Sequence, residues 1–257
     1  ILIFIFIFRS MFFLLIKRPS IIFGMGGYAS FPICIAATFL KIKFFIYENN
    51  LIIGKANRYL LPFANKILVS FKELEGVPKK YKSKLFEVGN LIKKEIFNLP
   101  QKNTNNRKIR TIKILVLGGS QAAKIFAEKL PLIFRNCTNQ GMSLKIYQQC
   151  LSIQNDDLNL FYKKNNIDYE IFNFSHNLEK YFSKTDIAIT RSGSSMLAEL
   201  TNASVPFISV PLPSSADNHQ LKNALFYEKK KITFLIEEKD LNQKLSKLLE
   251  NIFENNS

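Results

Sequence analysis

Residues 186–224 hold the side chains of this sequence that are best suited to binding a phosphorylated ligand. An apolar run at 187–189 predicts a buried strand, a Gly/Ser turn follows at 191–195, and 196–200 has a helical pattern. A helix N-terminus favours phosphate because it offers unpaired N–H groups and a partial positive charge. Glu199 lies one turn into this helix, where its carboxylate can accept hydrogen bonds from a ribose diol. The pattern therefore predicts a nucleotide site.

Such a turn also has a purely structural interpretation, because Ser caps many helices and Gly allows tight turns. The next predicted strand, at 205–210, favours binding. It is followed by a Pro-Leu-Pro sequence and then by the polar residues 217–220, after which a helix begins. Ligands bind at the carboxyl ends of strands in open parallel sheets, so two successive strand ends would bring polar groups to one edge.

Two further glycine-rich turns lie between a predicted strand and a predicted helix. Residues 24–30 follow a strand at 20–23, and residues 118–121 follow a strand at 114–117. The second turn is suited to a diphosphate, or to charge that develops on one. Neither turn has the spacing of a P-loop or of G-x-G-x-x-G, and no G-x-S-x-G motif occurs. ATP hydrolysis by a P-loop, NAD binding and serine hydrolysis are therefore disfavoured.

Strands alternate with helices along the sequence, which predicts parallel sheets covered by helices on both faces, in two lobes. A polar, lysine-rich stretch at 98–113 is typical of a linker. We therefore expect an α/β protein with an N-terminal lobe at 1–100, a linker at 101–112 and a C-terminal lobe at 113–257. The expected strands are 20–23, 44–47, 66–71, 85–88, 114–117, 144–147, 169–172, 187–189, 205–210 and 233–236, and the expected helices are 32–40, 55–63, 122–134, 153–164, 178–182, 196–200 and 241–253.

The charge of the chain indicates an anionic partner. The formal net charge is +16, which suits a nucleotide, an acidic membrane surface or a nucleic acid. Part of this charge has a compositional explanation, because the sequence is rich in Lys, Ile, Phe and Asn. The net charge is the only feature that suggests nucleic-acid binding, so we do not expect the protein to bind nucleic acid. Three widely spaced cysteines, Cys34, Cys137 and Cys150, indicate a reducing compartment and argue against a metal site.

The apolar segment 1–16 contains Arg9 and is followed by Lys17 and Arg18. It is shorter than the ~20 residues that a membrane-spanning helix needs. Three interpretations are open: a buried core segment, a patch on a membrane surface, and a membrane anchor. The basic flank favours the membrane-surface patch.

Six short motifs follow one another along most of the sequence: G-M-G-G-Y-A-S at 24–30; E-N-N at 48–50 with Gly54 and Asn57-Arg58; Gly89-Asn90; L-G-G-S-Q at 117–121; Arg191-Ser192-Gly193 with Glu199; and V-P-L-P at 210–213 with Asp217, His219-Gln220 and Asn223-Ala224. Their types and order resemble the MurG family, the peptidoglycan transferases that add N-acetylglucosamine to lipid I and so make lipid II. The resemblance implies two Rossmann-like lobes of the GT-B type, with the N-terminal lobe incomplete because it lacks its first strand and glycine loop.

The resemblance also implies which residues bind the donor, UDP-N-acetylglucosamine. Asn50 and Ser120 would contact it, 194–199 would hold the uridine and diphosphate with Glu199 on the ribose, and Gln220 would reach the sugar hydroxyls. The backbone at Ser175 would meet the uracil, and Lys93 would lie near the diphosphate. The expected substrate-binding residues are Asn50, Lys93, Ser120, Ser175, Ser194, Ser195, Met196, Leu197, Ala198, Glu199 and Gln220.

The implied reaction is inverting transfer to the sugar hydroxyl of lipid I, with UDP as the leaving group. Helix N-termini at Ser120 and Ser195, together with Lys93, would stabilise the leaving diphosphate, so we expect neither a metal ion nor a cofactor. The lipid acceptor gives the segment 1–18 a role in docking on the anionic inner membrane. The resemblance thus implies a peripheral enzyme at the cytoplasmic face of the bacterial plasma membrane.

The sequence departs from the family pattern in several places. Tyr47 stands where the family has histidine, and Lys93 keeps the charge of the usual arginine without its bidentate geometry. No G-G-T-G-G-H loop, which carries the family's candidate base, precedes Ile1, and we assign no catalytic residue. Two alternatives therefore stay open: a donor-binding chain that is catalytically incomplete, and another GT-B enzyme such as a glycolipid transferase or a UDP-N-acetylglucosamine epimerase.

Overall fold

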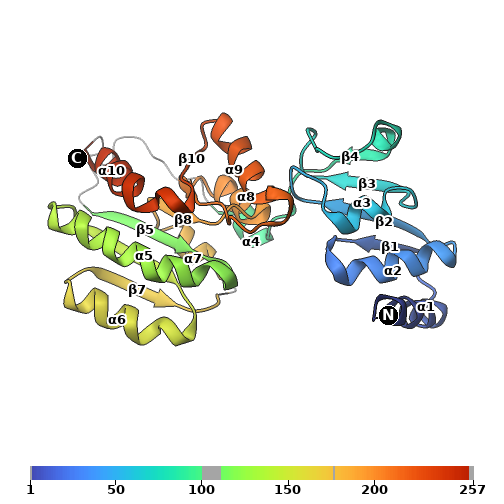
Figure 1. The fold of residues 1–257 in the computed structure, drawn as a ribbon, viewed down its shortest axis with the longest axis horizontal. Coiled ribbons are helices and arrows are strands. Elements are labelled where there is room, and N and C mark those ends of the chain that lie inside the picture. The colour runs from blue at the N-terminus through green and yellow to red at the C-terminus, as the bar shows by residue number, and fades with distance from the viewer. Residues whose placement is uncertain (1, 100–110, 176, 255–257) are drawn as a thin grey trace. The chain divides into compact units, whose positions relative to one another are not determined.

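A computed structural model describes residues 2–99, 111–175 and 177–254, without the side chains of 120–123. The chain divides into two compact units, Ile1–Leu91 and Ile92–Ser257, each built on a parallel sheet (Figure 1). The predicted α/β class with two parallel-sheet lobes is confirmed.

The boundary between the units differs from the expected one at residue 100. Helix α4 (Lys94–Phe97) belongs to the second unit. Helix α4 contacts helix α8 (Ser194–Asn202), where the side-chain amide of Asn202 donates a hydrogen bond to the Ile96 carbonyl at 3.0 Å. Most of the predicted linker lies outside the described residues, so its assignment stays a prediction.

The first unit contains a four-stranded parallel sheet whose strands follow the order of the sequence. Its core lies between this sheet and two helices, with Phe44, Ile46 and Ile67 fully buried. Ile46 pairs in register with Ile67 on the neighbouring strand. The elements are β1 (Ile21–Gly24), α2 (Gly27–Phe39), β2 (Lys43–Glu48), α3 (Lys55–Leu60), β3 (Lys66–Val69), the 3-10 helix η1 (Lys79–Lys84) and β4 (Leu85–Glu87).

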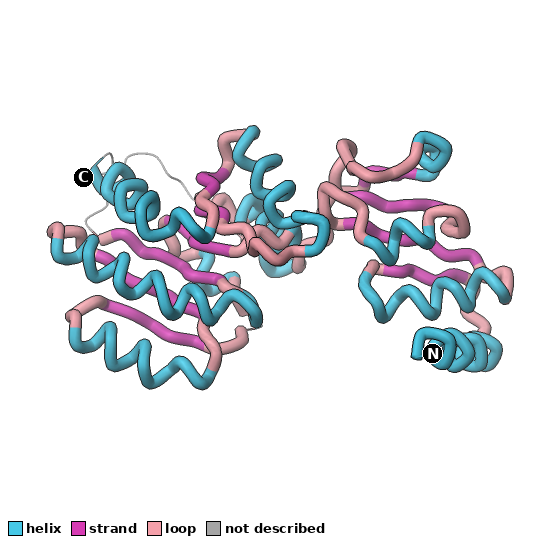
Figure 2. Tube along the Cα trace, viewed as in Figure 1, coloured by secondary structure: helices cyan, strands magenta, loops and turns pink. Residues whose placement is uncertain are grey.

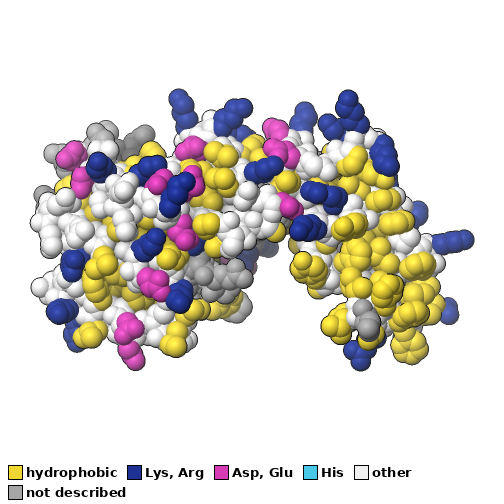
Figure 3. Space-filling view, viewed as in Figure 1, with side chains coloured by type: hydrophobic (Ala, Val, Ile, Leu, Met, Phe, Trp, Pro, Cys, Tyr) yellow, Lys and Arg dark blue, Asp and Glu magenta, His cyan; other side chains and the backbone are white. Residues whose placement is uncertain are grey.

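The segment at the start of the chain forms helix α1 (Leu2–Lys17). Only a narrow stripe of it faces the core: Leu14 is buried, and Met11 packs against the same cluster. Most of its other apolar side chains are exposed, and they contribute to the apolar surface of the first unit in Figure 3. The interpretation as a buried core segment is therefore wrong. No helix within the described ranges has the length and apolar character needed to cross a membrane.

The second unit contains a six-stranded parallel sheet of order β10-β9-β8-β5-β6-β7. Its elements are β5 (Ile112–Leu117), α5 (Gly119–Asn139), β6 (Leu144–Gln149), η2 (Ser152–Gln154), α6 (Asn155–Lys164), β7 (Asp168–Phe172), α7 (Glu179–Phe182), β8 (Ile187–Thr190), α8, β9 (Phe207–Ser209), η3 (Ala216–Asn218), α9 (His219–Lys229), β10 (Thr233–Leu235), η4 (Glu238–Asp240) and α10 (Leu241–Glu254).

Helices cover both faces of this sheet, as Figure 2 shows for the arrangement of helices and strands. On one face Ile114 and Ile189 pack with Phe126 of α5 and Leu245 of α10 in one buried cluster. On the other face aromatic rings from strands meet rings from helices, as with Phe207 of β9 and Tyr227 of α9 at 6.0 Å. Because β-strand side chains alternate between the two faces, the continuous apolar runs of these strands fit a sheet buried on both sides.

Helices α2 and α5 begin at least three residues earlier than the sequence predicts. Helix α2 starts at Gly27, so Pro32 lies inside it instead of at its first turn. Proline lacks an N–H and removes the bond to the carbonyl four residues earlier, which here belongs to Tyr28, a residue that is 90% exposed. Helix α5 starts at Gly119 instead of residue 122, directly after its strand.

Candidate functional site

The carboxyl edge of the second sheet contains a point where the strand order reverses. Strand β5 has β6 on one side and β8 on the other, so the connections after β5 and β8 lead away in opposite directions. Ligands in open α/β sheets bind in the crevice that such a reversal creates. The loops that follow β5 and β8 are two of the three glycine-containing turns that the sequence analysis identified, at 118–121 and 191–195.

The loop after β8 leads directly into α8. Gly193 is the N-cap residue, and because glycine has no side chain, no side-chain cap bonds the first N–H groups of the helix there. A Cβ atom added at Gly193 would meet no atom within 4 Å, so the space beside the helix start is open. This nine-residue helix therefore presents its positive end to an open site at the strand reversal.

The side chains of α8 divide between the core and the surface. Leu197 and Ala198 are buried, so they offer a ligand no exposed side chain and only their backbone is left for the predicted contact. Ser194 is also buried, whereas Ser195 is exposed and Met196 is half-buried. Of the residues predicted to hold the uridine and diphosphate, Ser195 thus places its side chain best for contact with a ligand.

Glu199 is half-buried on α8, one turn after Ser195. Burial raises the pKa of its carboxyl above the ordinary value of 4.5, and the positive charge of Lys93 partly opposes this shift. The structure therefore brings together Lys93 and Glu199, which the sequence analysis selected separately. A partly desolvated carboxylate gains from accepting hydrogen bonds, which is what a ribose diol would supply.

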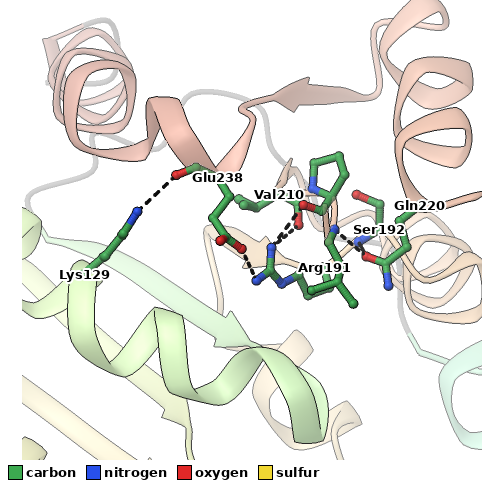
Figure 4. Close-up of polar contacts among 8 residues, drawn as sticks. Lys129, Arg191, Ser192, Val210, Gln220 and Glu238 are labelled. Atoms are coloured by element: carbon green, nitrogen blue, oxygen red, sulfur yellow. Dashed lines mark hydrogen bonds and ion pairs between the residues drawn. The ribbon is translucent and has the colours of Figure 1, made fainter. Parts of the chain in front are cut away.

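Gln220 connects the loops that follow β8 and β9 (Figure 4). Its side-chain oxygen Oε1 accepts hydrogen bonds from the backbone N–H of Ser192 at 3.2 Å and of Leu212 at 3.0 Å. This arrangement fixes the orientation of the amide, since Oε1 faces the two backbone donors and Nε2 faces away from them. Gln220, predicted as a sugar contact, therefore also holds two loops in place.

Arg191 lies beneath the same loops and is almost fully buried. Its Nη1 donates to the carbonyls of Val210 at 3.2 Å and Pro211 at 3.1 Å. Its Nη2 forms an ion pair with Glu238 of η4, and its guanidinium carbon lies 4.9 Å from the centre of the Phe126 ring. Figure 4 shows these groups converging from separate elements, with Lys129 of α5 donating to the Glu238 carbonyl.

Glu238 is the residue of this group that sequence reasoning missed. It lies 47 positions after Arg191, in an acidic stretch just before α10. Local patterns suggest only that such residues begin a helix, because Asp and Glu are common in the first turn. Nothing in the sequence indicates which cation the carboxylate meets.

Two other predicted residues lie at the carboxyl edge of the same sheet, Ser120 at the start of α5 and Ser175 on the loop after β7. Gly119 has a φ of 62° and opens helix α5, so a residue with a side chain would be strained there. Ser120 follows it in the first turn, and its side chain lies outside the described residues. Ser175 follows β7, and its hydroxyl accepts a hydrogen bond from the Asn177 N–H at 3.1 Å.

Asn50 belongs to the first unit and is held by Glu48, a buried carboxylate at the end of β2. The oxygen Oε1 of Glu48 accepts hydrogen bonds from the backbone N–H and the side-chain amide of Asn50, both at 3.1 Å. Its other oxygen accepts bonds from the Gly54 N–H at 2.9 Å and from the Asn57 amide at 3.0 Å. The E-N-N motif is therefore one network in which Glu48 orients Asn50.

Tyr47, which stands where the MurG family has histidine, contacts three backbone or hydroxyl groups. Its hydroxyl lies 2.8 Å from the Ser70 Oγ, donates to the Gly89 carbonyl at 3.1 Å and accepts from the Leu91 N–H at 3.1 Å. These bonds attach the last residues of the first unit to its sheet.

Models of both domains of one protein family match this chain. The Glycosyltransferase family 28 N-terminal domain matches residues 2–69, and the Glycosyltransferase family 28 C-terminal domain matches residues 113–257. Both matches follow the division of the structure into two units.

Two curated relatives carry the name UDP-N-acetylglucosamine–N-acetylmuramyl-(pentapeptide) pyrophosphoryl-undecaprenol N-acetylglucosamine transferase. The protein from Pelagibacter ubique is 36% identical over 251 residues, which cover 97% of this chain and 69% of the relative. The protein from Rickettsia bellii is 35% identical over 251 residues, covering 96% and 70%. The crystal structure of Acinetobacter baumannii MurG matches with a TM-score of 0.78 and 24% identity, covering 97% of this chain and 69% of that one. This last likeness shows a shared GT-B fold.

Proposed function

This chain belongs to glycosyltransferase family 28, and on that premise we propose that it transfers N-acetylglucosamine from UDP-N-acetylglucosamine to lipid I, giving lipid II. The observation that carries the proposal is the 36% identity to the Pelagibacter ubique transferase along 97% of this chain. The geometry of the second unit supports it, because an open helix N-terminus and a partly buried carboxylate lie together at the strand reversal.

In this proposal the second unit binds the donor. The N-terminus of α8 takes the diphosphate through backbone N–H groups at Ser194, Ser195 and Met196. Glu199 accepts hydrogen bonds from the ribose, and the backbone at Ser175 meets the uracil. Gln220 directs its Nε2 group to the hydroxyls of the sugar, an orientation supported by the two backbone bonds that its Oε1 accepts.

The chemistry that follows is an inverting displacement. A hydroxyl of the lipid I sugar gives its proton to a general base, to which we assign no residue, and attacks the anomeric carbon of N-acetylglucosamine. The bond from that carbon to the UDP oxygen breaks, and UDP leaves. Negative charge grows on the diphosphate during this step. The N-termini of α5 and α8 and the charge of Lys93 stabilise it, since fixed dipoles that face a developing charge need little reorganisation.

The lipid acceptor requires contact with a membrane, and we assign that role to α1. Its exposed side chains include Phe4, Phe8 and Phe12, and Lys17 and Arg18 follow at its end. We propose that α1 lies in the membrane surface and that the enzyme acts as a peripheral protein at the cytoplasmic face of the plasma membrane.

The donor site is tested by calorimetric titration of the chain with UDP-N-acetylglucosamine. We expect Glu199→Ala to weaken binding roughly 10-fold to 100-fold, because a hydrogen bond to a charged group contributes about 1.5–3 kcal/mol. Glu228→Ala is the matched control, since Glu228 is an exposed glutamate on another helix of the same unit, and it should bind as the unchanged chain does. Equal affinities for the two variants would remove Glu199 from the site.

A transfer assay with radiolabelled donor and lipid I in detergent then separates the enzyme from its alternative. Labelled lipid II is the expected product. Tight donor binding without any product would favour a chain that binds the donor and is catalytically incomplete.

A further inference from the structure

The side-chain amides of Asn155 and Asn173 form a reciprocal pair at the carboxyl edge of the second sheet. Asn155 is the first residue of α6, and Asn173 directly follows β7. The Nδ2 of Asn173 donates to the Oδ1 of Asn155 at 3.1 Å, and the Nδ2 of Asn155 donates to the Oδ1 of Asn173 at 3.3 Å. Two hydrogen bonds between the same two amides fix their relative orientation as well as their distance.

This amide pair is also attached to the end of β6 through Cys150. The Asn173 Nδ2 donates to the Cys150 carbonyl at 3.1 Å, and the Cys150 thiol donates to the Asn155 Oδ1 at 3.2 Å. The backbone N–H of Cys150 donates to the Phe172 carbonyl at 3.0 Å, so the pairing of β6 with β7 continues to the last residue of β7. Three elements, β6, α6 and β7, therefore meet at Asn173.

The backbone runs from this anchor directly to Ser175, which the site assignment places at the uracil. Ser175 lies two positions after Asn173, and its hydroxyl accepts a hydrogen bond from the Asn177 N–H at 3.1 Å. Before the anchor, the ring of Phe172 stacks on the ring of Tyr181 with centroids 4.2 Å apart. The segment 173–175 is therefore held at both ends, and a displacement of Asn173 is transmitted to the backbone of Ser175.

The position of this backbone matters because the hydrogen-bonding groups of uracil and cytosine differ. Uracil, like thymine, has an O4 acceptor, whereas cytosine has an N4 amino donor at that place. A fixed backbone group that bonds one of these bases is left unpaired opposite the other, and an unpaired polar group in a site strongly disfavours the wrong ligand. Such discrimination needs a backbone that is held in place by its surroundings.

We propose that the Asn155–Asn173 amide pair positions the loop after β7 so that the donor site selects uracil over cytosine. The inference rests on the proposed function, because it assigns base selectivity to the same donor site. Both asparagines are positioning residues, which act through the backbone of Ser175 and not by contact with the nucleotide.

Calorimetric titration with UDP and with CDP tests this selectivity, expressed as the dissociation constant of CDP divided by that of UDP. The unchanged chain should bind UDP more tightly. We expect Asn155→Ala and Asn173→Ala each to weaken UDP binding about tenfold, the effect of losing about one hydrogen bond to the base. The affinity for CDP should stay within about twofold, since its diphosphate and ribose are bound elsewhere in the site.

The double variant Asn155→Ala with Asn173→Ala should lose no more selectivity than either single variant, because the two amides act as one unit. Asn165→Ala is the matched control. Asn165 is the C-cap residue of α6, at the other end of the helix from Asn155, and its amide donates to the Phe161 carbonyl at 2.7 Å. This control should keep the selectivity of the unchanged chain. Circular dichroism checks that each variant is folded.

Equal weakening of UDP and CDP binding would overturn the inference, because it would indicate a general loss of structure in the site. An unaltered selectivity in the variants of the pair, or the same loss in Asn165→Ala, would also overturn it. Titration of the unchanged chain with UDP-N-acetylglucosamine keeps the two proposals apart. Donor binding with a selectivity that the variants do not alter rejects the amide pair alone, whereas a chain that does not bind the donor rejects the proposed function and this inference together.

Discussion

Glu199 shows how one residue combines two opposing electrostatic effects. Burial on α8 disfavours its charged form and raises its pKa, whereas the positive charge of Lys93 lowers it. The folded protein therefore binds the proton of this group more tightly than the unfolded chain does. Its contribution to the free energy of unfolding is complete below the unfolded pKa and is lost as pH rises through the folded pKa.

Donor affinity should have the opposite pH dependence, because the ionised carboxylate is the form that accepts two ribose hydroxyls. We expect the affinity for UDP-N-acetylglucosamine to fall as pH is lowered through the pKa of Glu199, which lies above the ordinary value of 4.5. In Glu199→Gln the affinity should be lower and should no longer change in this pH window. Calorimetry from neutral to acidic pH measures both curves, and parallel curves for the two proteins would contradict the assignment.

The position of the Asn50 side chain depends on its neighbours. The carboxylate of Glu48 accepts two hydrogen bonds from Asn50 and two more from Gly54 and Asn57. The Asn50 amide also donates to the side-chain oxygen of Asn49 at 3.0 Å. Glu48 is buried and Asn50 is partly exposed. We infer that Glu48 positions Asn50, whose contact with the donor stays a prediction.

The side chain of Arg191 connects four secondary-structure elements of the second unit. It extends from the end of β8, bonds the carbonyls at the end of β9, pairs with Glu238 on η4 and lies over Phe126 of α5. Its side chain is only 8% exposed. A buried cation of this kind must be paired, because leaving it unpaired costs several kcal/mol.

We expect Glu238→Met to destabilise the second unit by about 3–5 kcal/mol, since it leaves the Arg191 charge buried without a carboxylate. The double variant Arg191→Met with Glu238→Met should lose less than the sum of the two single variants, because neither charge is then left alone. Urea denaturation of the four proteins gives the interaction free energy.

Lys244→Met is the matched control for this cycle. Lys244 of α10 forms an ion pair with Asp240 of η4, the short helix that also contains Glu238. The side chain of Lys244 is 62% exposed. Exposed ion pairs contribute little to stability, so this variant should unfold near the urea concentration of the unchanged chain. Strictly additive losses in the Arg191 and Glu238 cycle would mean that their contact carries no net stabilisation.

For the molecule as a whole, charge and apolar surface coincide at the start of the chain. The basic residues up to Lys43 are Arg9, Lys17, Arg18, Lys41 and Lys43, and no acidic residue lies among them. Helix α1 exposes most of its apolar side chains in the same segment. Apolar burial and attraction to anionic lipid therefore act together in the proposed membrane docking.

We expect the chain to sediment with vesicles that contain anionic lipid and to bind neutral vesicles much more weakly. Replacing both Lys17 and Arg18 by Gln should weaken binding roughly 30-fold, since each basic residue near an anionic surface contributes about 1 kcal/mol. The matched control replaces Lys163 and Lys164, an adjacent exposed pair on α6 in the second unit. Equal weakening by the two double variants would show that net charge, and not α1, drives the association.

The sequence by itself determined the features that depend on neighbouring residues. Apolar runs and the turns between them predicted the alternation of strands and helices, and the turn at Gly193 predicted a helix start beside Glu199. These predictions succeeded because a strand, a turn and a helix each form from residues that are close in the sequence. The residue roles that came from the family resemblance, such as those of Asn50 and Gln220, stay predictions about ligand contact.

The tertiary structure alone decided the order of the strands and the partners of buried charges. Placing β8 beside β5 creates the reversal that puts the two glycine turns at one crevice, and pairing Arg191 with Glu238 joins residues 47 positions apart. The same holds for α1, whose apolar pattern does not reveal which stripe faces the core. Such outcomes depend on contacts between distant segments, and the free energy of those contacts is set by how complete elements pack and not by local sequence.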